Sequence, residues 1–188
     1  YTSMQAPEKV LELARLLAPY QGHILVHIVP FTDLQLAIYE HCEESYAITI
    51  MRRMMYRIAE RLAQKQNCLA IVNGESIGQV ASQTLESMHT INAVTSMPII
   101  RPVATMDKVE IIDLARKVGT YETSIQPWED CCTIFTPKNP VTKPTIRRAE
   151  ALERRFDFET LLEACVEQTE SVHVYPTKPA EEEVSDLF

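Results

Sequence analysis

The sequence lacks the features of a membrane-spanning or secreted protein. No apolar run approaches the ~20 residues that a membrane helix needs, and the first residues, YTSMQAPEKV, contain neither the basic nor the apolar segment of a signal peptide. Cysteine is also scarce: the five cysteines are an odd number and form no CxxC pair. We therefore expect no disulfide scaffold, no zinc site and no membrane contact, and we predict a reducing, cytoplasmic location.

Clustered positive charge is largely absent too. The net charge of −8 is a poor footprint for a domain that binds nucleic acid alone, because phosphate contacts need grouped Lys and Arg. Basic residues do gather between residues 138 and 155, whereas the C-terminal end, EEEVSDLF, is acidic. We expect residues 1–170 to form one domain and residues 171–188 an acidic tail. If RNA is the substrate, another domain or subunit must supply most of the affinity.

The sequence does contain an alternation of helical and strand patterns. Helical spacing of apolar residues predicts helices over residues 10–18, 34–41, 47–65, 80–88, 108–118 and 146–167, and short apolar runs predict strands over 23–30, 68–72 and 98–100. This alternation predicts an α/β fold with a doubly wound parallel sheet. Ligands of such sheets bind beyond the carboxyl ends of the strands, where Gly74, Glu75 and the region of Arg101 fall.

The first candidate site is the segment VNGESIGQVASQT, residues 72–84, which runs from strand to turn to helix. Gly74 would let a ligand approach the backbone closely. Gln79 and Gln83, four residues apart, would face one side of the helix, where their amides could bind a base or a phosphate. Ordinary polar capping of a helix N-terminus is the alternative.

Basic side chains form the second group of candidates. Arg52 and Arg53 are adjacent on a predicted helix and point about 100° apart, so one could face the strand ends and bind a phosphate while the other faces solvent. Lys108 follows Asp107, an N-cap, at the start of a helix that Gly119 should end. A lysine beside a helix N-terminus suits a phosphate. Freely solvated side chains are the alternative for each.

The third candidate is the pair Cys131 and Cys132, in a proline-rich segment, residues 126–144, which we expect to be a long loop. The thiolate is the reactive form of cysteine, and the two preceding carboxylates disfavour it. Activation therefore needs a cation such as Lys108, and a structural role is the alternative. The other cysteines lie in helix or strand patterns and are expected in the core: Cys42, Cys68 and Cys165.

These candidates lie within four longer stretches: MRRMMYRIAERLA, NGESIGQVASQTL, RPVATMDKVEIIDLARKVGTYE and EDCCTIFTPKNPVTKP. Together the four resemble the tRNA 4-thiouridine synthetases, also called thiamine-biosynthesis sulfurtransferases. The resemblance extends from residue 1 to the 170s. It implies a PP-loop ATP pyrophosphatase domain, which is Rossmann-like and of the adenine nucleotide alpha hydrolase type.

The resemblance also implies an activity. ATP, with Mg²⁺, would adenylate O4 of the uridine at position 8 of tRNA, and persulfide sulfur from a cysteine desulfurase would then replace AMP. This order is sensible because AMP leaves more readily than a carbonyl oxygen. The family's nucleotide contacts match Arg52, Gly74 and Gln83, its adenylation lysine matches Lys108, and its sulfur-transfer cysteine matches Cys131. In some members the same sulfur serves thiamine thiazole synthesis.

Three departures accompany the resemblance. No SGGxDS-type PP-loop occurs in the chain, so we expect the main phosphate cradle and the first strand of the sheet to be missing. The family's N-terminal RNA-binding region, through which tRNA would mainly bind, and the C-terminal rhodanese domain of some members are also missing. We therefore expect a fragment that is inactive alone and that folds with a partner chain, such as a homodimer mate. A different PP-loop ATP pyrophosphatase, or a non-catalytic fragment that binds a nucleotide or a partner, remains an alternative.

Overall fold

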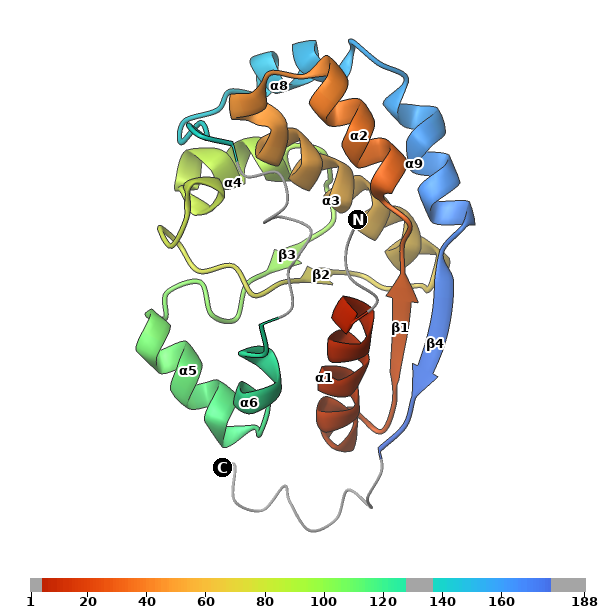
Figure 1. The fold of residues 1–188 in the computed structure, drawn as a ribbon, viewed down its shortest axis with the longest axis vertical. Coiled ribbons are helices and arrows are strands. Elements are labelled where there is room, and N and C mark those ends of the chain that lie inside the picture. The colour runs from red at the N-terminus through yellow and green to blue at the C-terminus, as the bar shows by residue number, and fades with distance from the viewer. Residues whose placement is uncertain (1–4, 128–136, 177–188) are drawn as a thin grey trace. The chain divides into compact units, whose positions relative to one another are not determined.

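The computed structural model describes residues 5–127 and 137–176 (Figure 1). Helices alternate with short strands along this part of the chain. The chain divides into two compact units. The first comprises residues 1–28, 107–135 and 169–188, and the second comprises residues 29–106 and 136–168. Each unit is described by itself.

The first unit is built on an antiparallel ribbon of two strands. Strand β1 (Ile24–Ile28) pairs with β4 (Glu170–Val174), so that Ile24 lies opposite Val174 and Ile28 opposite Glu170. Helix α1 (Gln5–Gln21) runs beside the ribbon (Figure 1). The unit also contains α5 (Lys108–Lys117) and the short α6 (Tyr121–Ser124), which packs on α1 and α5. Its fully or nearly buried apolar side chains are Ala14, Ala18 and Val174.

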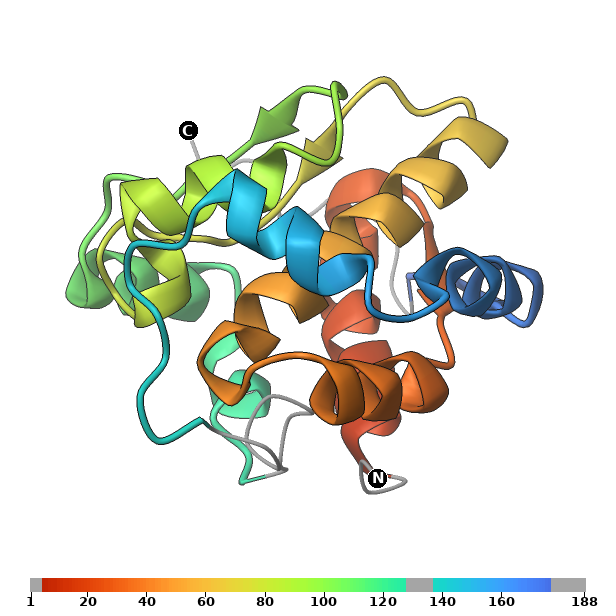
Figure 2. The ribbon, with the colours of Figure 1, turned by 90° about the horizontal axis from the view of Figure 1, so that it is seen from above.

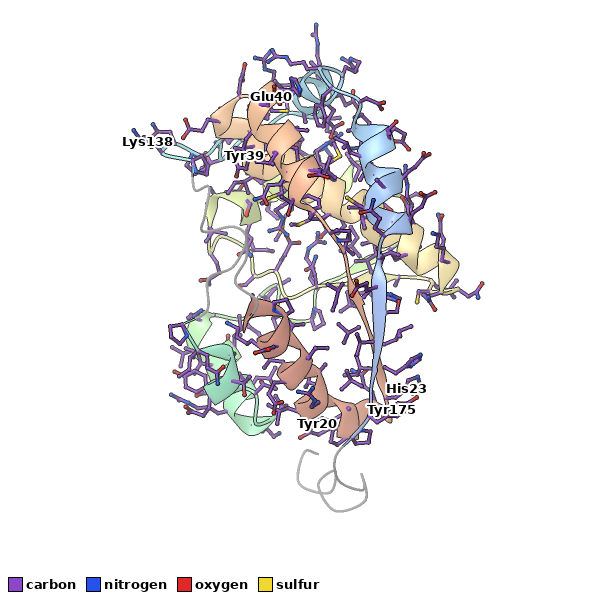
Figure 3. The ribbon with its side chains drawn as sticks, turned by 45° about the vertical axis from the view of Figure 1, so that its right-hand side comes forward. Tyr20, His23, Tyr39, Glu40, Lys138 and Tyr175 are labelled. Carbon is purple, nitrogen blue, oxygen red and sulfur yellow. The ribbon has the colours of Figure 1, made fainter. Side chains whose placement is uncertain are left out.

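This pairing differs from the sequence prediction in one respect. The strand expected over residues 23–30 is present, but its described partner is β4, which lies far away in the sequence and runs antiparallel. Residues 171–174, which we expected to belong to the acidic C-terminal tail, form part of β4. Figure 3 shows His23 and Tyr175 close together at one end of this ribbon, and their ring centroids are 6.1 Å apart. An alternating pattern identifies a strand but does not identify its partner.

The second unit contains the predicted parallel strand pair. Strands β2 (Ile71–Val72) and β3 (Ile99–Ile100) lie side by side (Figure 2), with Ile71 opposite Ile99 and Val72 opposite Ile100. The amide of Asn73 extends the pairing by donating to the carbonyl of Ile100, at 3.1 Å. The two chains therefore leave the pair at the same edge, as the carboxyl ends of parallel strands do.

Helices form the remainder of the second unit. They are α2 (Thr32–His41), α3 (Ala47–Lys65), α4 (Leu85–Asn92), α8 (Ile146–Glu153) and α9 (Phe158–Glu167), with single 3₁₀ turns η1 (Glu44–Tyr46) and η2 (Ala81–Gln83). The predicted apolar face of α3 is confirmed, because Ile50, Met54 and Ile58 are all buried at steps of four residues. Around that face pack Leu34, Ile38, Leu152 and Leu162.

The helix predicted over residues 80–88 begins later than expected. Residues 81–83 form η2, and α4 begins only after Thr84, whose Oγ1 caps it by accepting from the amide of Ser87 at 3.1 Å. Gln79 therefore lies in a turn and Gln83 in η2, so the prediction that both face one side of a helix is wrong. Within the described residues, no helix is long and apolar enough to cross a membrane.

Candidate functional site

A buried carboxylate, Glu75, connects the ends of β2 and β3 to α3 in the second unit. Only 4% of Glu75 is exposed. Its backbone amide donates to Asn73 Oδ1 at 3.1 Å, which holds the turn that follows β2. Its carboxylate accepts from Arg101 Nε at 2.8 Å, from Tyr56 Oη at 3.1 Å, from Asn73 Nδ2 at 3.0 Å and from Arg52 Nη2.

Two of these donors extend the network. Arg101, which follows β3, also donates to Asn92 Oδ1 of α4 at 2.8 Å. Tyr56, on α3, accepts from Asn73 Nδ2 while it donates to Glu75. Burial, and then the negative charge of Glu75, raise the pKa of the Tyr56 phenol, so this hydroxyl remains a donor at neutral pH. Together these contacts tie α3, α4 and both strand ends into one polar cluster.

This cluster carries more positive than negative charge. The guanidinium groups of Arg52 and Arg101 share the single carboxylate of Glu75, and their side chains are 23% and 15% exposed. A partly exposed guanidinium whose charge is not fully balanced suits an anion such as phosphate. The prediction that one of the adjacent arginines faces the strand ends is confirmed for Arg52.

Gln83 directly follows Ser82, and Ser82 contacts Arg52. Arg52 Nη1 donates to Ser82 Oγ at 3.4 Å, a long and weak contact. The side-chain oxygen of Gln83 is buried, and it is the buried side-chain polar atom without a hydrogen-bond partner in the part of the chain that the structure describes. Buried polar atoms are seldom left without a partner, so this acceptor, one residue from the Ser82 that Arg52 contacts, is a candidate ligand contact.

Gly74 lies between β2 and Glu75 and is exposed. A Cβ atom built on Gly74 would meet nothing within 4 Å, and its φ lies outside the left-handed region. Neither backbone conformation nor packing within the protein therefore requires glycine at this position. The space above Gly74 is open, and the close approach of a ligand to the backbone there stays a prediction.

The loops after β2 and β3 are also bonded to each other. Ser76 Oγ donates to the carbonyl of Met106 at 2.8 Å, and the amide of Ile77 donates to the carbonyl of Ala104 at 2.9 Å. Gly78 has a φ of 82°, a left-handed conformation that favours glycine. These contacts fix the path of the chain from Glu75 towards Gln83.

Arg53 has a different role from the one that the sequence predicts. It is only 1% exposed, and it donates from Nε and Nη2 to the two carboxylate oxygens of Glu153, at 2.6 and 3.1 Å. Arg57 donates to the same carboxylate, at 2.9 and 3.0 Å. Burial raises the pKa of Glu153, but these hydrogen bonds and charges outweigh it and hold that pKa below its ordinary value. The expectation that the second arginine faces solvent is therefore wrong.

Lys108 is the first residue of α5, in the first unit. The predicted N-cap is confirmed, because Asp107 Oδ1 accepts from the amides of Val109 and Glu110, at 2.8 and 2.9 Å. The predicted end of α5 is confirmed by Gly119, whose φ is 77°. Lys108 is exposed, and within the described ranges, 5–127 and 137–176, its side chain makes no hydrogen bond or ion pair. The helix amides nearest to it are already bonded, so a phosphate there would depend on the lysine itself.

The described cysteines differ in burial and in the pKa of their thiols. Burial raises the pKa of the Cys42 thiol to about 11 and also raises the pKa of Cys165, so both are poor nucleophiles. Cys68 is exposed, contrary to its predicted place in the core, because β2 begins only at Ile71. Cys131 and Cys132 lie outside the described residues. Among the residues that are described, no three of His, Cys, Asp and Glu form a group that could hold a metal ion.

Comparison with known proteins identifies the family. Residues 1–158 match the family described as Thiamine biosynthesis protein (ThiI). The chain belongs to this family. The probable tRNA sulfurtransferases of Bacillus pumilus (strain SAFR-032) and Bacillus subtilis (strain 168) are 54% and 50% identical to it over 188 residues, which are the whole of this chain. The chain spans 47% of the length of each of these relatives.

A solved structure shows the same fold. It is the crystal structure of a 4-thiouridine synthetase–RNA complex with bound ATP, which is 40% identical to this ThiI-family chain with a TM-score of 0.88. The match covers 93% of this chain and 46% of that one. The predicted α/β fold with a parallel sheet, of the PP-loop, Rossmann-like type, is therefore confirmed, and so is the family resemblance that led to it.

The sequence identified part of this site but not its centre. Arg52, Gly74 and Gln83 all lie in the second unit, where Arg52 bonds Glu75 and Gly74 directly precedes it. Glu75 and the region of Arg101 could be placed at strand ends, but their mutual contact could not be foreseen, and neither could the contribution of Tyr56. Tyr56 follows Arg52 by four residues and therefore lies on the same face of α3, which is a local signal that could have pointed to it.

Proposed function

We propose that this chain is part of an ATP-dependent tRNA sulfurtransferase that makes 4-thiouridine at position 8 of tRNA. The observation that carries the proposal is the agreement between the family match and the site. The relatives at 54% and 50% identity are named probable tRNA sulfurtransferases, and the 40% identical solved protein is a 4-thiouridine synthetase with RNA and ATP bound. The cluster around Glu75 lies at the carboxyl ends of β2 and β3, the edge at which open α/β sheets bind ligands, and this supports a nucleotide site there.

The residues of the second unit fit an adenine nucleotide. Arg52 and Arg101 provide positive charge beyond the single carboxylate that they share, which suits the phosphates. Gln83 provides a buried acceptor without a partner, which suits an exocyclic amino group of a base. The open space above Gly74 admits a close approach to the backbone. We assign Arg52, Gly74 and Gln83 to nucleotide binding, with Mg²⁺ accompanying the phosphates.

ATP supplies the AMP group that makes O4 of uridine a leaving group. Lys108 then has the role of neutralising the negative charge that develops on phosphate during adenylation. Cys131 participates in the sulfur transfer, in which the terminal sulfur of a persulfide bonds to C4 as AMP leaves, and a thiol then cleaves the S–S bond by forming a disulfide. Its thiol needs a cation to become a thiolate, and Lys108 is the candidate for that cation. Cys42 and Cys165 are unsuitable for this role because burial raises the pKa of each.

The partners follow from the chemistry. A cysteine desulfurase supplies the persulfide, and tRNA binds mainly through an N-terminal RNA-binding region outside this chain, which agrees with the net charge of −8. A homodimer is part of the proposal, and so is sulfur delivery to thiamine thiazole synthesis. A cytoplasmic location suits both tRNA and a thiol that must stay reduced.

The test uses the full-length protein with unmodified tRNA, ATP, a cysteine desulfurase and cysteine. Nucleoside mass spectrometry should detect 4-thiouridine only when ATP is present, and pyrophosphate should be released in step with it. Pyrophosphate release that depends on a substrate other than tRNA would instead favour a different PP-loop ATP pyrophosphatase. Nucleotide binding without any pyrophosphate release would favour a non-catalytic binding protein.

A further inference from the structure

We infer that Glu75 is a positioning residue for nucleotide binding, which it serves by holding the guanidinium groups of Arg52 and Arg101 at the ends of β2 and β3. The inference rests on the proposed function, because it assumes that the cluster binds ATP. Nothing in the residue's neighbourhood in the sequence indicates this role. It emerges from contacts that join three separate segments of the second unit: α3, the turn after β2 and the loop after β3.

The hydrogen bonds of Glu75 leave it no direct role towards a ligand. Four side-chain donors reach its carboxylate, and one of its oxygens, Oε2, receives three of them. An ionised carboxylate has about four lone-pair sites, so these contacts account for its capacity to accept. With only 4% of the residue exposed, Glu75 is neither an open metal ligand nor an accessible general base. Its influence on a ligand must pass through the groups that it holds.

The contacts of Arg52 show how Glu75 can affect a bound ligand through this arginine. The Nη2 group of Arg52 is held by Glu75, whereas its Nη1 group makes only the 3.4 Å contact with Ser82 Oγ. The strongly bonded end of the guanidinium is therefore fixed, and the weakly bonded end faces the residue next to Gln83. A phosphate or a ribose oxygen can replace the weak contact without disturbing the strong one.

Electrostatics makes the carboxylate necessary for this arrangement. Arg52 and Arg101 come from α3 and from the loop after β3, and Glu75 is the acidic residue that bonds both. Without its charge, two partly buried guanidinium groups would repel each other, and each would gain by moving towards solvent. The charge of Glu75 thus keeps two cations at one place where an anion is to bind.

A second cluster on α3 offers a matched comparison. Glu153 also holds two arginines, Arg53 and Arg57, and its side chain is 3% exposed. Arg53 is 1% exposed and Arg57 is 19% exposed, whereas Arg52 is 23% and Arg101 15% exposed. The two clusters therefore differ mainly in position and in their other contacts: Arg57 also lies over the Phe158 ring, whereas Arg52 and Arg101 lie at the ends of β2 and β3. We therefore assign a structural role to Glu153 and the positioning role to Glu75.

The experiment compares Glu75→Gln with Glu153→Gln in the full-length protein. Equilibrium binding of ATP is measured by calorimetry, KM for ATP and kcat are measured for tRNA thiolation, and Tm is measured by thermal unfolding. Both variants should lower Tm, since each removes a buried charge that pairs two arginines. Only Glu75→Gln should weaken ATP binding and raise KM for ATP, by about tenfold, with a smaller change in kcat. Glu75→Asp, which keeps the charge, should recover most of the affinity.

The outcomes separate this inference from the proposed function. An unchanged affinity for ATP in Glu75→Gln, alongside a lowered Tm, would overturn the positioning role, and so would an equal loss of affinity in Glu153→Gln. If Glu75→Gln fails to fold, Glu75→Asp is the deciding variant. A normal Tm with a two- to threefold lower affinity for ATP, about 0.4–0.7 kcal/mol, supports the positioning role. Wild-type affinity for ATP in this variant opposes it. A wild-type protein that binds ATP but does not thiolate tRNA would refute the proposed function and leave the Glu75 comparison valid. A wild-type protein that binds no ATP would refute both.

Discussion

Arg53 and Glu153 form a two-point ion pair inside the second unit, with Nε 2.6 Å from one carboxylate oxygen and Nη2 3.1 Å from the other. Both side chains are almost fully buried. The remaining guanidinium nitrogen donates to the carbonyl of Thr90 at 2.6 Å. Charges in such a position are retained because each has its partner, and removing one partner leaves the other buried and unpaired.

Glu153→Ala should therefore destabilise the protein severely, by about 3–5 kcal/mol, because Arg53 and Arg57 lose their shared carboxylate. Glu150, on the same helix, is exposed. Glu150→Ala should change the free energy of unfolding by less than about 0.5 kcal/mol. Urea unfolding of both variants measures the difference. Equal effects would show that the buried pair contributes nothing beyond an ordinary surface charge.

The lowered pKa of Glu153 predicts an acid-sensitive fold. In the folded protein this carboxyl group holds its proton less tightly than in the unfolded chain, whose Glu pKa is about 4.3. Between the folded-state and unfolded-state pKa values, the unfolded state therefore binds more protons than the folded state. The stability that Glu153 contributes is fully present above the unfolded-state pKa and is lost as the pH falls through the folded-state pKa. Thermal unfolding from pH 7 to pH 3 should show a steeper loss for the wild type than for Glu153→Gln. Parallel curves would contradict the prediction.

Gln83→Met should separate binding from stability. The substitution removes the buried, unpaired oxygen at nearly constant volume, so Tm should stay the same or rise. ATP affinity should fall about fivefold, since the acceptor that we assign to the nucleotide is lost. Gln79→Met is the control, because Gln79 is exposed in the neighbouring turn. A lower Tm with unchanged affinity would mean that Gln83 serves the fold and not the ligand.

Lys108→Gln should lower the rate of uridine adenylation by about 100-fold, the usual loss when one charge-stabilising donor is removed. Its Tm should not change, because the side chain is exposed. Lys65→Gln, at the exposed end of α3, removes the same charge elsewhere and should leave the rate unchanged. Pyrophosphate release in the presence of tRNA is the measurement. A rate close to that of the wild type in Lys108→Gln would exclude the lysine from the adenylation step.

Cys131→Ser should abolish 4-thiouridine formation while pyrophosphate release persists, because sulfur transfer needs a thiol and adenylation does not. Cys68→Ser is the matched control, since Cys68 is the exposed cysteine among those in the described segments. Its activity should equal that of the wild type. Nucleoside mass spectrometry and pyrophosphate release, measured on the same samples, distinguish the two steps. Full thiolation by Cys131→Ser would remove this residue from the mechanism.

The sequence predicts well those features that depend on near neighbours in the chain. The apolar face of α3, the N-cap Asp107 and the left-handed Gly119 are each specified within a few residues. The start of α4 was missed because the capping residue is Thr84, while the apolar pattern already begins at Val80.

The centre of the site could not be predicted in the same way. Whether Glu75 is buried depends on donors from α3 and from the loop after β3, and no local pattern reports such contacts. Arg52 and Arg53 differ in burial because Arg53 pairs with Glu153, which lies a hundred residues later in the sequence. The family resemblance pointed to Arg52, Gly74 and Gln83, but not to the carboxylate that holds Arg52 in place.

The position of α3 has a consequence for motion in the second unit. Neighbouring residues of this helix, one turned towards Glu75 and the next towards Glu153, are each held by a different carboxylate. The helix can neither rotate about its axis nor slide along it without breaking at least one of these ion pairs. A rearrangement of the second unit that keeps both ion pairs must then leave α3, Glu75 and Arg101 in place, with α3 as the fixed frame of reference.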